Sequence, residues 1–122
     1  MVWAGIAQDV GKALNPLAVE GQMEGGVAQG VGLALMEEIQ TEAGLITNAN
    51  FTDYLLPTML DMPRVEIRLI EEPHPDAPYG VKGVGEGPTV VSPAAVLSAL
   101  RDASKQPLTR VPVRPDDLIG LA

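Results

Sequence analysis

The sequence contains no cysteine. This absence excludes a disulfide framework, a thiolate nucleophile, and cysteine ligands to zinc or to an iron–sulfur cluster within the chain. Any iron–sulfur cluster that works with this chain must therefore be ligated elsewhere. A cysteine-free chain also fits a reducing compartment, so we expect a cytoplasmic location.

Basic residues are scarce. Eight Lys and Arg stand against 16 Asp and Glu, which gives a net charge of −8. Such a chain repels phosphate backbones, so we expect no binding to nucleic acid. The most apolar stretch, residues 27–36, is too short to span a bilayer, so we expect no membrane partner.

Glycine and proline are abundant, with 13 and 11 residues among 122. This density favours long irregular loops with demanding backbone geometry. It does not indicate disorder, because 46 % of the residues are hydrophobic. The length suits one domain.

Two segments carry signals for long helices. Asn15 followed by Pro16 predicts a capped start, and the helix should run to about Glu38. Ser92 followed by Pro93 repeats this signal and predicts a second helix, to about residue 103. The buried faces should carry Val19, Met23, Val27, Val31 and Leu35 in the first helix, and Leu97 and Leu100 in the second.

The remaining elements are short. Strands are expected at residues 2–8 and 65–69, the second because apolar and charged side chains alternate there. Residues 39–47 predict a hairpin with Gly44 at positive φ, and residues 115–118 can start a short terminal helix. These elements predict an α+β fold, with two helices packed on a small, largely antiparallel sheet and long loops rich in Gly and Pro.

The first helix carries glycines that each cost about 1 kcal/mol relative to Ala. They stand at positions 21, 25, 26, 30 and 32. Two explanations stay open and are compatible: close packing against another backbone, or approach of a ligand. Gln22 and Gln29 lie seven residues apart, hence on one face, but a helix-to-loop hydrogen bond is the simpler role for such amides.

The loop "YGVKGVGEGPT", residues 79–89, surrounds Glu86 with glycines. A phosphate cradle is disfavoured, because Lys82 precedes the glycines, Glu86 adds negative charge, and a dinucleotide loop would directly open a helix. Glycines do allow a carboxylate to approach a cofactor or substrate closely, as a general base must. Spacing alone nevertheless favours a plain turn with a solvated Glu. His74, alone between two prolines, is expected to be solvated, and we expect no metal ligand in the chain.

Four motifs occur in one order along the chain: "QDVG…NP" from residue 8, "EGQMEGGVAQG" from residue 20, "FTDYLLPT" from residue 51 and "KGVGE" from residue 82. Together they resemble the C-terminal end of the molybdenum-binding subunit of the xanthine dehydrogenase and aldehyde oxidase family, over residues 6–119. The phrases "DMP", "APYG" and "RVPVRP" are most similar to bacterial xanthine dehydrogenases.

The resemblance implies a role for each matched residue. Glu86 would be the catalytic base of a molybdenum hydroxylase, which oxidises an electron-poor carbon of a heterocycle or aldehyde. Gln22 would hydrogen-bond the molybdopterin cofactor. The cofactor-lining loop would consist of Lys82, Gly83, Val84 and Gly85. The substrate suggested by the overall similarity is a purine such as xanthine or hypoxanthine. Gly87 departs from the family, in which Pro often follows the catalytic Glu.

The resemblance also implies partners. The family's molybdenum subunit is several times longer, so residues 1–122 would form a single partial domain that shares its cofactor with the rest of that subunit. Iron–sulfur clusters and FAD would lie on partner chains or domains, and activity would require this larger assembly. Two alternatives remain: a truncated, non-catalytic remnant or interaction module that docks on a related subunit, and a hydroxylase of aldehydes or other N-heterocycles.

Overall fold

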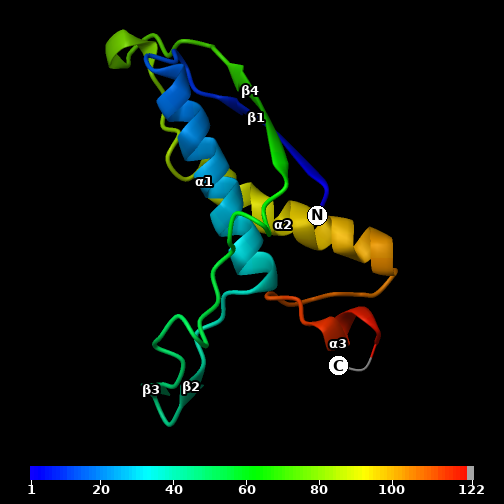
Figure 1. Cartoon of the computed structure of the whole chain (residues 1–122). Helices are drawn as coiled ribbons and strands as arrows, with labels where there is room; N and C mark the ends of the chain where they lie inside the picture. The colour runs from blue at the N-terminus through cyan, green and yellow to red at the C-terminus, as the bar shows by residue number, and fades with distance from the viewer. Residues whose placement is uncertain (121–122) are drawn as a thin grey trace.

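The computed structural model describes residues 1–120, which form two long helices, a pair of longer strands and several short elements (Figure 1). In chain order these are β1 (Trp3–Asp9), α1 (Pro16–Leu35), β2 (Thr41–Glu42), β3 (Leu45–Ile46), β4 (Arg64–Ile70), the 3-10 turn η1 (Pro78–Gly80), α2 (Gly87–Ser104) and α3 (Pro115–Leu118). This content confirms the predicted α+β class.

Helix α1 begins at the predicted residue. The Asn15 side chain accepts a hydrogen bond of 3.1 Å from the Ala18 backbone N–H, and Pro16 follows the cap. The helix ends earlier than predicted, at Leu35, which is 36 % exposed. Met23, Val27 and Val31 are buried as predicted, whereas Val19 is half-buried. Gly26, Gly30, Gly32 and Ala34 complete the buried face.

Helices α1 and α2 cross at two glycines of α1 (Figure 1). A Cβ added to Gly30 would lie 2.3 Å from the Ser92 Cβ, and one added to Gly26 would lie 2.8 Å from the Pro88 Cβ. Real Cβ atoms do not approach so closely, so only glycine lets the two helices meet here. The close-packing explanation is therefore confirmed at these two positions.

Helix α2 begins at Gly87, so the start predicted at Ser92 is wrong. Pro88 already occupies the first turn, where a missing N–H is harmless, and a second proline, Pro93, lies inside the helix. The Ser92 hydroxyl donates to the Pro88 carbonyl (2.5 Å) rather than capping a helix start. The chain thus carries two proline start signals, and the helix uses the earlier one.

Strands β1 and β4 pair in parallel, in register from Trp3 opposite Arg64 to Asp9 opposite Ile70. The prediction of a largely antiparallel sheet is therefore wrong for the main strand pair. The reason is the connection between the strands. Helix α1 and residues 36–63 carry the chain back to the end of the sheet at which β1 begins, so β4 runs in the same direction as β1, as in other strand–helix–strand units. The alternation of apolar and polar residues did not reveal the direction. Side chains of a two-stranded sheet with one covered face alternate in burial whether the strands are parallel or antiparallel.

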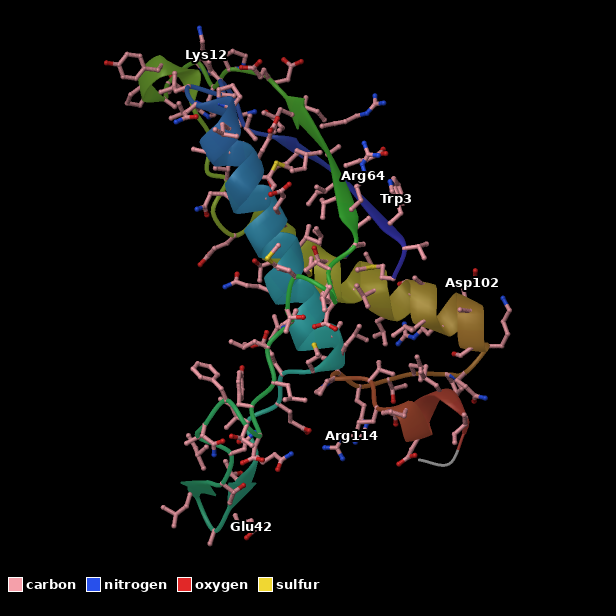
Figure 2. The ribbon with its side chains drawn as sticks, viewed as in Figure 1. Trp3, Lys12, Glu42, Arg64, Asp102 and Arg114 are labelled. Carbon is pink, nitrogen blue, oxygen red and sulfur yellow. The ribbon has the colours of Figure 1, made fainter. Side chains whose placement is uncertain are left out.

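Residues 36–63 project from the helices as an arm that carries the antiparallel hairpin β2–β3 (Figures 1 and 2). The hairpin confirms its prediction, with Ala43 and Gly44 both at positive φ. Glu42 lies at its tip (Figure 2). Within the arm, the Tyr54 hydroxyl donates to the carboxylate of Glu37, two residues after the end of α1, at 2.7 Å.

The C-terminal segment returns to α1 and ends in α3, as predicted. The Val113 N–H donates to the Ala34 carbonyl at 2.7 Å, and the Val113 and Leu108 side chains are buried. Arg114 forms an ion pair with Glu38. Helix α1 also contacts β4, beside which its N-terminal half lies (Figure 1).

Candidate functional site

The glycine-rich loop, residues 81–86, joins η1 to α2 and opens directly into that helix (Figure 1). Direct opening into a helix is the context that the sequence analysis found missing for a nucleotide loop. The other two objections to phosphate binding stand, because Lys82 precedes the glycines and Glu86 occupies the N-cap of α2.

Glu86 lies at the junction of the loop and α2. Its backbone carbonyl accepts a bond from the Val90 N–H (3.2 Å), which starts the helix. Its side chain is exposed, and no group within residues 1–120 donates a hydrogen bond to it or forms an ion pair with it. The backbone of Glu86 is therefore fixed by the start of the helix, whereas its carboxylate oxygens are available to a group outside this chain.

Lys82 is paired with Asp9 rather than with Glu86. The Lys82 ammonium donates to the Asp9 carboxylate, and the Gly11 N–H donates to the same side chain at 2.9 Å. The hydrogen bond from Lys82 and, to a smaller extent, that from Gly11 hold the pKa of Asp9 below its usual value. The Lys82 N–H also donates to the Val10 carbonyl (3.0 Å), so its backbone is engaged as well.

Gln8 holds the next part of the loop. Its Nε2 donates to the Gly83 carbonyl at 3.2 Å, and its side chain fills the space beside Gly87, 2.7 Å from where a Cβ would be. No role for Gln8 or Asp9 was predictable from the sequence. Their only signal was membership of the "QDVG" motif, because their partners lie 73–75 residues away in the sequence.

Four glycines in the loop and on α1 have free space where a side chain would be, and we call them open. A Cβ added to Gly83 or Gly85 of the loop, or to Gly21 or Gly25 of α1, would have no atom within 4 Å. Packing within this chain therefore does not require glycine at these positions. They leave backbone accessible to something outside the chain, which is what close approach of a flat, extended cofactor needs.

The two glutamines of α1 have different surroundings. Gln29 accepts a hydrogen bond from the Thr89 hydroxyl at 3.0 Å. Thr89 lies in the first turn of α2, so the bond joins two helices and not, as predicted, a helix and a loop. Gln22 is exposed and makes no side-chain hydrogen bond within residues 1–120. It lies on the same face as Gln29, about 10 Å nearer the N-terminus of α1. Its amide is thus available beside the open glycines.

His74 is exposed, as predicted, and its Nδ1 accepts from the Asp76 N–H at 3.2 Å. Residues 1–120 contain no group of three or more His, Asp or Glu placed to bind a metal ion. None of the helices in this range has the length and apolar character needed to cross a bilayer.

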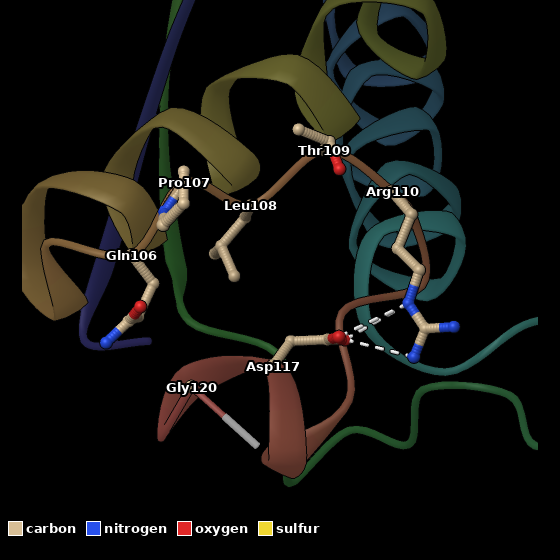
Figure 3. A pocket seen from close by; sticks show the side chains of 7 residues that line it. All are labelled: Gln106, Pro107, Leu108, Thr109, Arg110, Asp117 and Gly120. Carbon is tan, nitrogen blue, oxygen red and sulfur yellow. Dashed lines mark hydrogen bonds and ion pairs between the residues drawn. The ribbon is translucent and has the colours of Figure 1, made fainter. Parts of the chain in front are cut away.

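A hollow of about 660 Å³ lies far from Glu86, under the C-terminal segment (Figure 3). Arg110 and Asp117 form an ion pair of 3.3 Å across it. Helix α2 has 18 residues and a length of about 27 Å, and it separates this hollow from the loop at its other end. The hollow is therefore not part of the site built around Glu86.

Comparison with known proteins places the chain in a family. A family model described as "Molybdopterin cofactor-binding domain" matches residues 3–63. The xanthine dehydrogenase molybdenum-binding subunit of Escherichia coli O157:H7 is 39 % identical over 112 residues, which are 90 % of this chain and 15 % of that protein. The nicotine 6-hydroxylase large subunit of Paenarthrobacter nicotinovorans is 46 % identical over 97 residues, 79 % of this chain and 12 % of that protein.

Solved structures agree. Quinoline 2-oxidoreductase from Pseudomonas putida 86 superimposes with a TM-score of 0.88 at 37 % identity, over 95 % of this chain and 15 % of that one. Aldehyde oxidoreductase from Desulfovibrio gigas gives 0.85 at 33 % identity, over 96 % and 13 %. The chain thus spans about a seventh of the length of these proteins. It belongs to the molybdopterin cofactor-binding domain family, as its resemblance to the molybdenum subunits of the xanthine dehydrogenase and aldehyde oxidase family predicted.

Proposed function

We propose that this chain forms part of the molybdopterin site of a molybdenum hydroxylase and supplies Glu86 as the catalytic base. The observation that carries the proposal is the state of Glu86, an exposed carboxylate without a partner in residues 1–120, on a loop whose Gly83 and Gly85 are open. A general base must reach the proton that it accepts, and the open loop allows this approach.

We expect an extended cofactor to lie against the surface around Glu86. The backbone of Lys82, Gly83, Val84 and Gly85 would line it, and the Gln22 amide would donate to it or accept from it. When bound, the cofactor would supply the oxidising centre at which a substrate carbon is hydroxylated. The metal would be ligated by the cofactor and not by side chains of this chain.

Each residue of this chain has a limited task in that site. The Glu86 carboxylate accepts a proton at one of its oxygens, and the glycines keep side chains out of the space that cofactor and substrate need. The Lys82 ammonium is engaged with Asp9. Because this chain carries −8, we expect the rest of the assembly to supply most of the cations that balance an anionic cofactor.

The substrate we propose is a purine such as xanthine or hypoxanthine, in keeping with the bacterial xanthine dehydrogenase motifs. Other N-heterocycles and aldehydes are the alternatives, because the similar proteins named above include a nicotine 6-hydroxylase, a quinoline 2-oxidoreductase and an aldehyde oxidoreductase. The proposed partners are the rest of the molybdenum-binding subunit and the iron–sulfur and FAD modules, in the cytoplasm.

A second candidate is a non-catalytic remnant or interaction module. The observation that favours it is the exposed apolar surface of the arm, where Met59 is 94 % and Leu60 97 % exposed and available to a related subunit. Purification of the chain from its native cells, with molybdenum quantified in the eluate, separates the two. Molybdenum together with a larger partner supports the hydroxylase, whereas a chain without either supports the remnant.

The catalytic role is tested by Glu86→Gln in the purified complex. Loss of a general base typically lowers the rate by about 10²–10⁴-fold, and we expect kcat to fall by that much while molybdenum content is kept. Glu42→Gln, at the distant hairpin tip, is the matched control and should leave kcat unchanged. Full turnover by Glu86→Gln would exclude Glu86 as the base.

A further inference from the structure

The end of β1 contacts the glycine-rich loop at successive points. Gly11 pairs with Val81 in an isolated antiparallel bridge, and the Lys82 N–H donates to the Val10 carbonyl at 3.0 Å. The Asp9 carboxylate holds the Lys82 ammonium, and the Gln8 amide donates to the Gly83 carbonyl at 3.2 Å. The contacts follow the chain toward Glu86 one residue at a time.

The rest of the loop has little to hold it. No hydrogen bond within residues 1–120 involves Val84 or Gly85, and an added Cβ at Gly85 would touch nothing. Glycine-rich backbone loses much conformational entropy when it is fixed in one conformation. The Gln8 side chain supplies the last contact, since it also lies against Gly87 on the far side of Glu86.

We propose that Gln8 and Asp9 are positioning residues that hold the Glu86 loop against the end of β1, with Asp9 also keeping the Lys82 ammonium directed away from Glu86. The Gln8 side chain contacts the loop on both sides of Glu86, since it binds Gly83 before Glu86 and lies against Gly87 after Glu86. We call the contacts of Gln8 and Asp9 with the loop the clamp. The consequence of the clamp for catalysis rests on the proposed role of Glu86, whereas the clamp itself does not.

The charges around the clamp are consistent with this role. The Asp9 carboxylate meets the Lys82 ammonium and the Gly11 N–H, and the neighbouring Glu71 accepts from the Ala13 N–H at 2.8 Å. Asp9 is therefore the carboxylate paired with Lys82 among residues 1–120. Without Asp9, that ammonium becomes available to other carboxylates, Glu86 included.

The clamp is tested on the full 122-residue chain with a protease that cleaves after glutamate. Cleavage after Glu86 requires the loop to open, whereas Glu42, at the exposed hairpin tip, serves as the internal reference. Gln8→Met keeps side-chain length and removes the donor, and Asp9→Asn keeps shape and removes the charge. We expect both to raise the ratio of Glu86 to Glu42 cleavage several-fold, with far-UV circular dichroism unchanged.

Two further variants separate a clamp from general destabilisation. Asp102→Asn breaks an exposed ion pair with Lys105 at the other end of α2 and should leave the ratio at the wild-type value. Asp9→Glu keeps the charge and should restore it toward wild type. A wild-type ratio in both Gln8→Met and Asp9→Asn would overturn the inference, and so would a rise in Asp102→Asn as large as theirs.

In the assembled enzyme, Gln8→Met and Asp9→Asn should lower kcat per bound molybdenum while KM changes little, and Asp9→Glu should recover most of the rate. A purely structural role would reduce the amount of loaded enzyme but not the turnover of each loaded molecule. If Glu86→Gln proves fully active while the cleavage ratios change as expected, the proposed function fails and the clamp stands. Unchanged ratios overturn the clamp alone.

Discussion

Glycines of α1 differ in what a side chain would meet. An alanine at Gly30 improves helix propensity by about 1 kcal/mol, but its Cβ would lie 2.3 Å from that of Ser92. Overpacking costs about 1–3 kcal/mol, so we expect Gly30→Ala to lower the free energy of unfolding in urea. Gly25→Ala, with no atom within 4 Å, should raise it by up to about 1 kcal/mol. Changes of the same sign would contradict this division.

The ion pair of Asp9 predicts a pH dependence. The pKa of Asp9 is lower in the folded chain, so its contribution to stability is complete above the ordinary Asp pKa of about 3.9. That contribution is lost as the pH falls through the folded-state value. We expect urea midpoints of wild type and Asp9→Asn to differ at pH 7 and to converge toward pH 2. A difference that persists at pH 2 would mean that the charge of Asp9 is not its cause.

At the scale of the element, α1 depends on its N-terminal cap. The Asn15 side chain satisfies the Ala18 N–H, one of the donors that a helix start leaves unpaired. Asn15→Ala should therefore lower the free energy of unfolding by about 0.5–2 kcal/mol, measured by urea denaturation followed by circular dichroism. Asn15→Asp, which can still cap, is the control. Equal stability of the Ala and Asp variants would show that the cap contributes nothing.

Elements defined by local signals were predictable. The start of α1, the hairpin around Gly44 and the start of α3 each rest on a cap or turn within a few residues. The start of α2 was not, because its N-cap Glu86 makes no side-chain capping bond and its Ser92–Pro93 pair imitates a start. The packing of Pro88 and Ser92 on the glycines of α1 accompanies the earlier start.

At the scale of the whole molecule, the core is small and the exposed apolar surface is large. The buried apolar side chains described are Val10, Met23, Val27, Val31, Ala34, Leu108 and Val113. On the arm, by contrast, Phe51 is 79 % exposed, Met59 94 % and Leu60 97 %. Exposed apolar surface favours association with a partner or with a second copy of the chain. The arm therefore offers a surface for association.

We expect the isolated chain to self-associate, as measured by size-exclusion chromatography with light scattering. Added salt should strengthen association, because it screens the repulsion between chains of net charge −8. Met59→Lys combined with Leu60→Lys should shift the chain toward monomer, whereas Lys105→Gln, at the end of α2, should not. A monodisperse wild-type monomer at high salt would contradict the expectation.

The sequence by itself determined the family motifs, the α+β class and the elements that begin at a local cap or turn. It also identified Glu86, Gln22 and residues 82–85 as the candidate site. Only the tertiary structure decided that β1 and β4 run in parallel, that Lys82 binds Asp9, and that Gln8 holds the loop. The physical reason is range, because caps and turns act over a few residues. The strand pairing, by contrast, joins Trp3 to Arg64, and the contacts of Gln8 and Asp9 join residues 73–75 positions apart. Such partners are selected by how the helices and strands pack.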